Sequence, residues 1–177
     1  MPGPVFQSGD RVDLHVVAEA DLDAFTRART NPDVRLPLGI DTPGNSDTVE
    51  EFYEESISED DTYWFTVGVD GDLVGAVTFP EVERAPGVAD LSYWILPEHR
   101  REGYGLEAVS LLLAYGFDEL RLHRVQADSY ATNDASRGLL ESLGFTEEGR
   151  MRDAAFRKGS HVDVVRYGLL ETEWRDA

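Results

Sequence analysis

The sequence contains no cysteine, which excludes disulfides, thiolate metal sites and a cysteine nucleophile. Lysine is nearly missing as well, since Lys158 is the single lysine among 16 basic residues. No apolar run approaches the roughly 18 residues that a membrane-spanning helix needs. The first residues also lack the basic and then apolar layout of a signal peptide. We therefore expect a soluble, cytoplasmic protein.

Acidic residues dominate the charge: 35 Asp and Glu against 16 Lys and Arg give a net charge of −19. Such an excess favours a halophilic protein whose surface charges are screened by molar salt. The alternative is a mildly acidic mesophilic protein from a GC-rich genome, which would favour arginine codons. No basic cluster exceeds the pair Arg100-Arg101, so we expect neither a nucleic-acid nor a membrane partner. With 41% hydrophobic residues, the chain can form one folded domain over residues 1–177.

Strand and helix patterns alternate along the chain. Strand-like runs occur at residues 11–17, 63–69, 73–79, 91–96, 123–130, 145–152 and 162–170. Helical spacing occurs at 19–29, after the capping-box pair Asp47 and Glu50, from Gly103 to about 120, and from Asn133 or Asp134 to a stop at Gly144. Asp70-Gly71 signals a hairpin, whereas 80–88 is predicted to be an exposed loop. These patterns predict an α/β (α+β) domain with six or seven strands and about four helices.

A loop with two glycines lies between the predicted strand 91–96 and the long helix. It reads Arg100, Arg101, Glu102, Gly103, Tyr104, Gly105, Leu106. Small residues at 103 and 105 let backbone N–H groups approach a phosphate, and the start of the helix adds partial positive charge. A tight turn that merely needs glycine would have the same spacing, so the motif alone leaves both interpretations open.

The same loop also fits the dinucleotide fingerprint, as Gly103-x-Gly105-x-x-Ala108, with Asp128 as a ribose ligand. Two observations count against it. Six residues separate Leu96 from Gly103, whereas the fingerprint follows its strand almost at once. Only 49 residues follow Asp128, too few to complete such a sheet.

A second polar pair, Asn133 and Ser136, begins the last predicted long helix. Ser136 precedes Leu139, Leu140 and Leu143 by three, four and seven residues, which places its hydroxyl on the inward-facing stripe. An inward hydroxyl needs a partner. The common alternative is a serine that bonds its own backbone near a helix start.

In this order the motifs resemble the GNAT acetyltransferase superfamily, and within it the RimJ/RimL-type N-acetyltransferases, which modify protein α-amino groups. The resemblance covers nearly the whole chain. Its most specific segments are LSYWILPE at 91–98, RREGYGLEA at 100–108, YGFDEL at 115–120, HRV at 123–125, NDAS at 133–136, LESLGF at 140–145, Glu148-Gly149 and Glu173-Trp174.

The resemblance implies the GNAT fold, a mostly antiparallel mixed sheet that splays between two central parallel strands, here 91–96 and 125–130, with acetyl-CoA between them. It implies acetyl-CoA contacts at Ile95, Leu96, Arg100, Arg101, Glu102, Gly103, Tyr104, Gly105, Leu106, Asn133 and Ser136. Ser136 would also be the general acid that protonates the departing thiolate. Glu102 and Ser142 depart from the family pattern, which usually has a basic or small residue and a lysine there.

The general base is open at this point. Asp90, His99 and Glu83 are candidates, each with a solvated surface role as the alternative, and a relay through water would leave no mark on the sequence. The four histidines show no ligand spacing, so we expect no metal.

The expected activity is transfer of an acetyl group from acetyl-CoA to a primary amine, with the N-terminal α-amino group of a protein such as a ribosomal protein as the leading acceptor. A small amine, such as a polyamine or an amino sugar, is the enzymatic alternative. A non-catalytic acyl-CoA-binding regulator is the alternative from another class. A homodimer is possible, but no residue pattern points to one.

Overall fold

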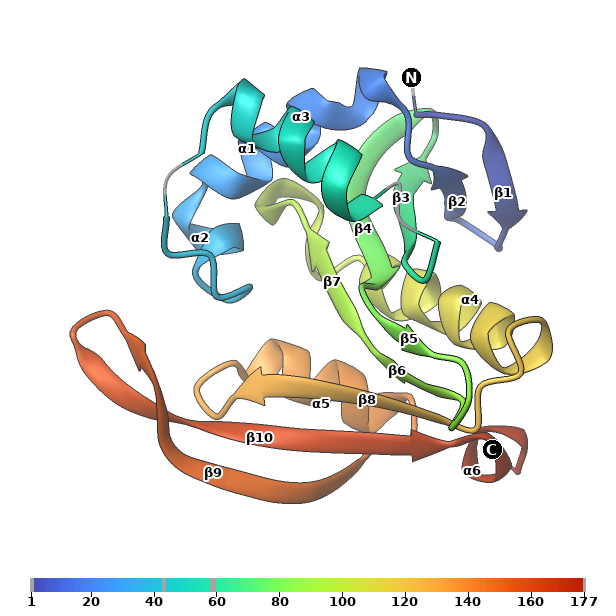
Figure 1. The fold of residues 1–177 in the computed structure, drawn as a ribbon, viewed down its shortest axis with the longest axis vertical. Coiled ribbons are helices and arrows are strands. Elements are labelled where there is room, and N and C mark those ends of the chain that lie inside the picture. Colours follow the sequence, from blue (N-terminus) through green and yellow to red (C-terminus); the bar gives the residue numbers. More distant parts are fainter. Residues whose placement is uncertain (1, 43, 58–59, 177) are drawn as a thin grey trace.

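The computed structural model describes residues 2–42, 44–57 and 60–176, and its strands form two five-stranded sheets (Figure 1). The first sheet has the order β1-β2-β3-β4-β7 and the second β5-β6-β8-β10-β9. The strands are β1 Val5–Ser8, β2 Asp13–Val16, β3 Tyr63–Val69, β4 Asp72–Phe79, β5 Val82–Glu83, β6 Val88–Asp90, β7 Ser92–Ile95, β8 Arg124–Tyr130, β9 Thr146–Arg157 and β10 Ser160–Leu170. The helices are α1 Leu22–Thr30, α2 Pro32–Arg35, α3 Ser46–Phe52, α4 Tyr104–Asp118, α5 Asp134–Ser142 and α6 Glu171–Arg175.

The expected fold class is confirmed: the fold is mixed and mostly antiparallel, and β6 with β8 is the parallel pair. Instead of one sheet of six or seven strands, the structure has two sheets. The reason is that the extended segment 88–95 changes its partner strand partway along. Its first part, β6, pairs with β8, and its second part, β7, pairs with β4. Leu91 lies between these two parts.

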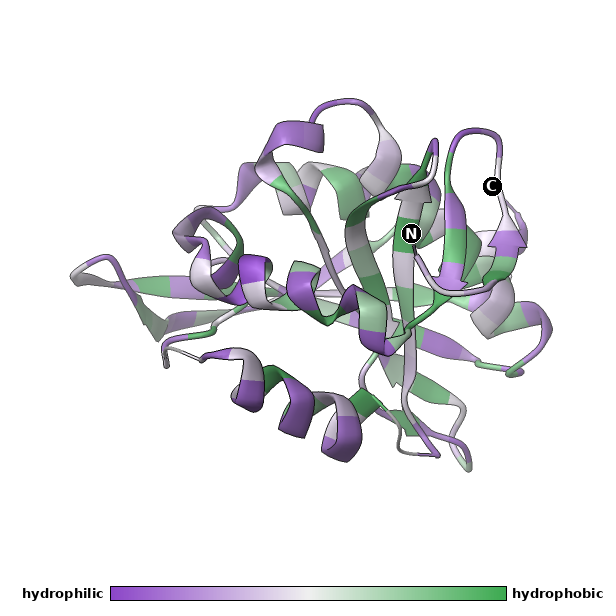
Figure 2. Cartoon of the chain, turned by 90° about the horizontal axis from the view of Figure 1, so that it is seen from above, coloured by the Kyte–Doolittle hydropathy of each residue, from purple (hydrophilic) through white to green (hydrophobic). Residues whose placement is uncertain are grey.

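The first sheet is covered by helices on both faces. Helix α4 buries Leu112, Leu113 and Phe117 against one face, where Gly116 lies so close to β4 that an added Cβ would meet the Phe79 ring at 2.9 Å. A second cluster, which includes Phe25 and Trp94, joins α1 and α3 to the other face. Figure 2 shows hydrophobic residues concentrated in the strands between these layers and hydrophilic ones along the outer helices and loops.

Local signals account for most elements. Asp70 and Gly71 have φ of 50° and 86°, the left-handed pair that a tight two-residue hairpin needs between β3 and β4. Gly144 ends α5 with φ of 87°, as expected of a residue that closes a helix.

Three expectations were wrong in detail. The residue that caps α3 is Asn45, whose side chain accepts from the Thr48 N–H at 3.1 Å, so the pair Asp47 and Glu50 is not the cap. The segment 80–88 holds the short strand β5 and the first residue of β6 rather than only a loop. Strand β1 and the short helices α2 and α6 had no predicted counterpart.

No helix of the described residues is long and apolar enough to cross a membrane.

Candidate active site

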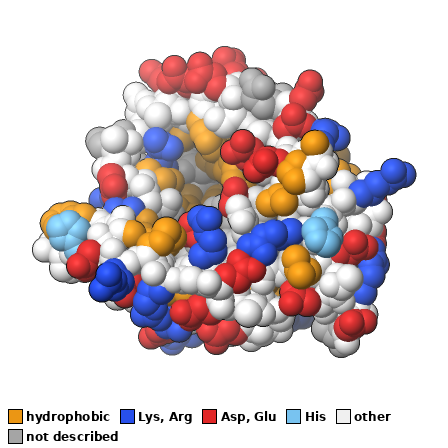
Figure 3. Space-filling model, turned by 60° about the horizontal axis from the view of Figure 1, so that its bottom comes forward, with side chains coloured by type: hydrophobic (Ala, Val, Ile, Leu, Met, Phe, Trp, Pro, Cys, Tyr) orange, Lys and Arg blue, Asp and Glu red, His pale blue; other side chains and the backbone are white. Residues whose placement is uncertain are grey.

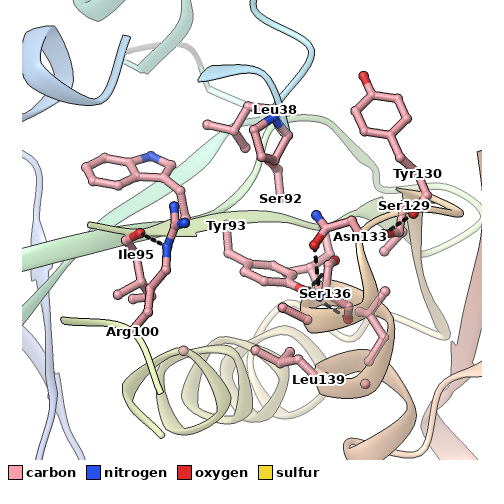
Figure 4. A pocket seen from close by; sticks show the side chains of 18 of the residues that line it. Leu38, Ser92, Tyr93, Ile95, Arg100, Ser129, Tyr130, Asn133, Ser136 and Leu139 are labelled. Carbon is pink, nitrogen blue, oxygen red and sulfur yellow. Dashed lines mark hydrogen bonds between the residues drawn. The ribbon is translucent and has the colours of Figure 1, made fainter. Parts of the chain in front are cut away.

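The main cavity opens where β7 separates from β8. The last bond that holds the two runs together joins the Leu91 N–H to the Gln126 carbonyl at 2.8 Å. Beyond it β7 pairs with β4, with Ser92 opposite Thr78. Strand β8 therefore has no hydrogen-bonded strand on the side that faces β7, while β10 still pairs with its other side. A cavity of about 980 Å³ lies in the resulting wedge, between β7, β8, the start of α4 and α5 (Figure 4).

The backbone of β7 presents alternate residues to this cavity. The Leu96 N–H donates to the Val74 carbonyl at 2.9 Å, and the Leu96 carbonyl accepts from the His99 N–H at 2.9 Å. Because bonded and non-bonded pairs alternate in an antiparallel ladder, the backbone groups of Tyr93 and Ile95 point away from β4, toward the cavity. Ile95 therefore fits its expected place. Leu96 does not: it is outside the lining, and both of its backbone groups are bonded within the protein.

The glycine loop forms the end of the cavity at the start of α4. Arg101 and Gly103 have φ of 67° and 86°, and α4 begins at Tyr104. The first N–H groups of a helix lack partners within it, and left-handed residues in front of them turn further N–H groups to the same side. Seven residues that the sequence places here line the cavity, namely Ile95, Arg100, Arg101, Gly103, Tyr104, Gly105 and Leu106.

Glu102 is the exception in this loop. It is exposed and outside the lining, and its carbonyl accepts from the Arg11 guanidinium at 2.9 Å. Arg11 also bonds the Glu107 carboxylate, at 3.3 Å through Nε and 2.7 Å through its backbone N–H. The acid at 102 thus faces outward, and the start of α4 is tied to the turn between β1 and β2.

Gly105 lies at the floor of the wedge. A Cβ built on it would lie 3.3 Å from Leu139 Cδ1 on α5 and 3.4 Å from Ile95 Cγ1 on β7. The missing side chain therefore lets α4, α5 and β7 meet closely beneath the cavity.

Asn133 and Ser136 are brought together at the start of α5. The Asn133 side chain caps the helix by accepting from the Ser136 N–H at 3.2 Å. The Ser136 hydroxyl does not bond its own backbone; it lies 2.8 Å from the Tyr93 hydroxyl (Figure 4). Burial raises the pKa of Tyr93 to about 12, against the opposing effect of its bond to Ser136. Tyr93 was missed by the sequence interpretation, because only the strand alternation at 91–96 places it on the face of Ile95.

The opposite end of the cavity is closed by segments from both ends of the chain. Val34, Pro37 and Leu38 line it, together with Ala154, Ala155 and Arg157 from the end of β9. Figure 4 shows Leu38 and Tyr130 on the side of the cavity opposite Leu139.

Arg157 is the charged group at this end. Its guanidinium bonds the Tyr130 hydroxyl, lies over the Tyr130 ring at 4.7 Å from the centroid, and bonds Asp41 at 3.1 and 3.2 Å. Its Nε is buried and has no hydrogen-bond partner among the described residues. Tyr130 and Asp41 thus hold the guanidinium in place at this end of the cavity.

The lining of the cavity is basic, in contrast to the surface. Acidic side chains are spread over the face that Figure 3 shows, which is hollowed beside a group of hydrophobic side chains. Inside, Arg100, Arg101 and Arg157 line the cavity, whereas Asp128 is the one carboxylate among the described lining residues. Arg166 neutralises that carboxylate through bonds of 2.8 and 2.7 Å. The cavity is therefore suited to anions and to carbonyl groups.

Of the three candidate bases, the structure brings only His99 to the cavity. Asp90 and Glu83 are exposed and lie outside the lining. His99 lies in the turn Pro97–His99 beside Arg100, at the glycine-loop end. Within the described residues, no group of three or more His, Asp or Glu could hold a metal ion.

These features fit an extended acyl-CoA. The left-handed glycine loop, the start of α4 and Arg101 suit a diphosphate, and Glu102 faces away from it. Arg100 instead donates to the Ile95 carbonyl at 2.9 Å and to the Asp33 carbonyl at 3.0 Å. The edge of β7 that faces the cavity offers backbone N–H groups to a pantetheine arm. The dinucleotide alternative loses its ribose ligand, because both carboxylate oxygens of Asp128 accept hydrogen bonds from Arg166.

Comparison with known proteins gives a consistent result. Residues 11–146 match the family model described as acetyltransferase (GNAT) domain. The "Putative ribosomal N-acetyltransferase YdaF" of Bacillus subtilis is 37% identical over 105 residues, which are 59% of this chain and 57% of that protein. The spermidine N(1)-acetyltransferase of Vibrio cholerae is 29% identical over 163 residues, 91% of this chain and 94% of that protein. The crystal structure of spermidine N-acetyltransferase from Vibrio cholerae with CoA and spermine has a TM-score of 0.89 and 24% identity, over 94% of this chain and 99% of that one.

Proposed function

We propose which amine this chain acetylates, given that it belongs to the GNAT acetyltransferase family and is an acetyl-CoA-dependent N-acetyltransferase. The proposed acceptor is the α-amino group at a protein N-terminus, such as that of a ribosomal protein. The charge of the cavity is the observation that carries this proposal. A polyamine has several ammonium groups and needs carboxylates around it. The acceptor end of this cavity instead holds the guanidinium of Arg157, a cation that disfavours ammonium groups and suits a peptide carbonyl.

Each part of the site then has a role in acetyl transfer. Acetyl-CoA supplies an activated acetyl thioester. The N–H groups at 101–106, with Arg101, hold its diphosphate, and Asn133 contacts the pantetheine arm. Arg100 donates to the Ile95 carbonyl at 2.9 Å and so holds the end of β7 in place. The backbone N–H groups of Tyr93 and Ile95 that face the cavity stabilise the negative charge that develops on the thioester oxygen.

Proton transfer is the remaining requirement. The attacking amine must be neutral. Asp90 and Glu83 lie outside the cavity, so the amine proton leaves through water or to His99, the one of the three candidate bases that lines the cavity. Ser136 gives its hydroxyl proton to the departing sulfur. No covalent acyl-enzyme is needed, in keeping with a chain that has no cysteine.

Replacing Arg157 with methionine distinguishes the peptide acceptor from the polyamine acceptor. Loss of a charge-assisted hydrogen bond to the peptide is expected to lower kcat/KM about tenfold for a peptide with a free N-terminus. Removing a cation is expected to raise kcat/KM for spermidine. Steady-state assays of thiol release with both acceptors measure the two effects.

The matched control is Arg150→Met on the same strand, since Arg150 pairs with Glu147 and Asp163 at 3.7 and 3.6 Å outside the cavity. It should leave both acceptors unchanged. If Arg157→Met left the peptide rate intact and spermidine remained the better acceptor of the unaltered protein, the peptide assignment would be wrong.

A further inference from the structure

Two hydroxyl groups meet across the wedge although they come from different elements. Tyr93 lies on β7 and Ser136 on the first turn of α5, 43 residues further along the chain. Their oxygens are 2.8 Å apart, a normal distance for an O–H···O bond. Both residues line the cavity, and Tyr93 also packs against the main hydrophobic core.

Either hydroxyl could donate in this bond, and the surrounding acceptors favour one direction. The Tyr93 hydroxyl has one proton and two nearby acceptors, the Ser136 hydroxyl at 2.8 Å and the Ser136 carbonyl at 3.3 Å. The longer distance exceeds the usual range for an O–H···O bond, so the Ser136 hydroxyl is the better acceptor for the phenol proton. In that direction the Ser136 hydroxyl accepts from Tyr93, and its own proton is left for a partner in the cavity.

We propose that Tyr93 is a positioning residue for the chemical step: its hydroxyl donates to Ser136 and directs the Ser136 proton toward the departing sulfur. The inference rests on the proposed function, in which Ser136 is the general acid. As the carbon–sulfur bond breaks, its electron pair stays on sulfur and takes the Ser136 proton. The Tyr93 hydrogen bond stabilises the serine oxygen as negative charge builds on it, and the proton lost by the amine restores the serine.

The surroundings of Tyr93 suit this role. Its pKa is raised to about 12 by burial, so the phenol keeps its proton at neutral pH and remains a donor. Asn133 holds the Ser136 backbone in place through the helix cap, which leaves rotation of the serine hydroxyl as the freedom that Tyr93 restricts. A structural role of the aromatic ring alone would not require its hydroxyl to meet Ser136.

The test is a double-mutant cycle with Tyr93→Phe, Ser136→Ala and the double variant. Tyr93→Phe keeps the ring and removes the hydroxyl. We expect it to lower kcat about tenfold while the Kd of acetyl-CoA stays unchanged. Because Tyr93 acts through Ser136, the double variant should be no slower than Ser136→Ala alone.

Tyr167→Phe is the matched control. The Tyr167 side chain is also buried, but its hydroxyl bonds Arg137 and Glu141 at 3.1 and 3.0 Å outside the cavity. Its loss should change thermal stability without changing kcat. If Tyr93→Phe folds poorly, 3-fluorotyrosine at position 93 provides the second test, since it keeps the donor and should hold kcat within about twofold.

The outcomes separate the two proposals. Unchanged kcat in Tyr93→Phe, a further loss in the double variant relative to Ser136→Ala, or a large loss with fluorotyrosine would each overturn the role of Tyr93. Full activity in Ser136→Ala would overturn the proposed acid itself. Loss in Ser136→Ala with none in Tyr93→Phe leaves the acid in place and removes only the positioning role.

Discussion

Replacing Ser136 with alanine is expected to lower kcat about 100- to 1000-fold, because a general acid in the transition state contributes a factor of that order. Without the hydroxyl, the thiolate must leave unprotonated or take a proton from water. The Kd of acetyl-CoA should change little, since the hydroxyl contributes mainly when sulfur departs. The helix cap should also survive, because Asn133 accepts from the Ser136 backbone N–H rather than from its side chain.

Single-turnover acetyl transfer, measured at saturating acetyl-CoA, isolates this step from binding. Calorimetric titration of the same sample with acetyl-CoA provides the control for an intact cleft. A variant that bound acetyl-CoA normally and turned over at the original rate would show that the proton comes from elsewhere.

Replacing Gly105 with valine is expected to weaken acetyl-CoA binding about 10- to 100-fold. The valine methyl groups would extend beyond a Cβ that already lies 3.3 Å from Leu139 and 3.4 Å from Ile95. Either α5 or β7 must then move, and overpacking of this kind costs about 1–3 kcal/mol. Because these elements form the two walls of the wedge, their displacement changes the shape of the cavity that binds acetyl-CoA.

The matched control is Gly149→Val on β9, where an added Cβ meets nothing within 4 Å and a β-branched residue suits the strand. It should bind acetyl-CoA like the unaltered protein. Titration of both variants, with circular dichroism to establish folding, measures the effect. Normal binding by folded Gly105→Val would show that acetyl-CoA does not use this part of the cavity.

Much of the fold could be predicted because its signals are local. The Asp70-Gly71 turn, the apolar stripe of α4 and the stop at Gly144 depend on residues within a few positions of one another. The glycine loop was likewise found from spacing, since its left-handed geometry is fixed by Gly103.

The rest depends on contacts between distant segments. The change of partner at Leu91 arises from competition between β4 and β8, which an alternating run does not reveal. For the same reason the sequence could not show that Leu96 is fully bonded to Val74 and His99, whereas Ile95 faces the cavity. The Tyr93–Ser136 pair and the contact of Arg157 with Asp41 join residues 43 and 116 positions apart. Such pairs leave no periodicity in a single sequence.

The most direct test of the account is to identify the nitrogen that receives the acetyl group. The protein is incubated in molar KCl with acetyl-CoA, a peptide that has a free N-terminus and one internal lysine, and an equal concentration of spermidine. Tandem mass spectrometry then locates the acetyl group. We predict acetylation at the peptide α-amine, with the lysine and spermidine essentially unmodified. Preferential acetylation of spermidine or of the lysine would contradict it.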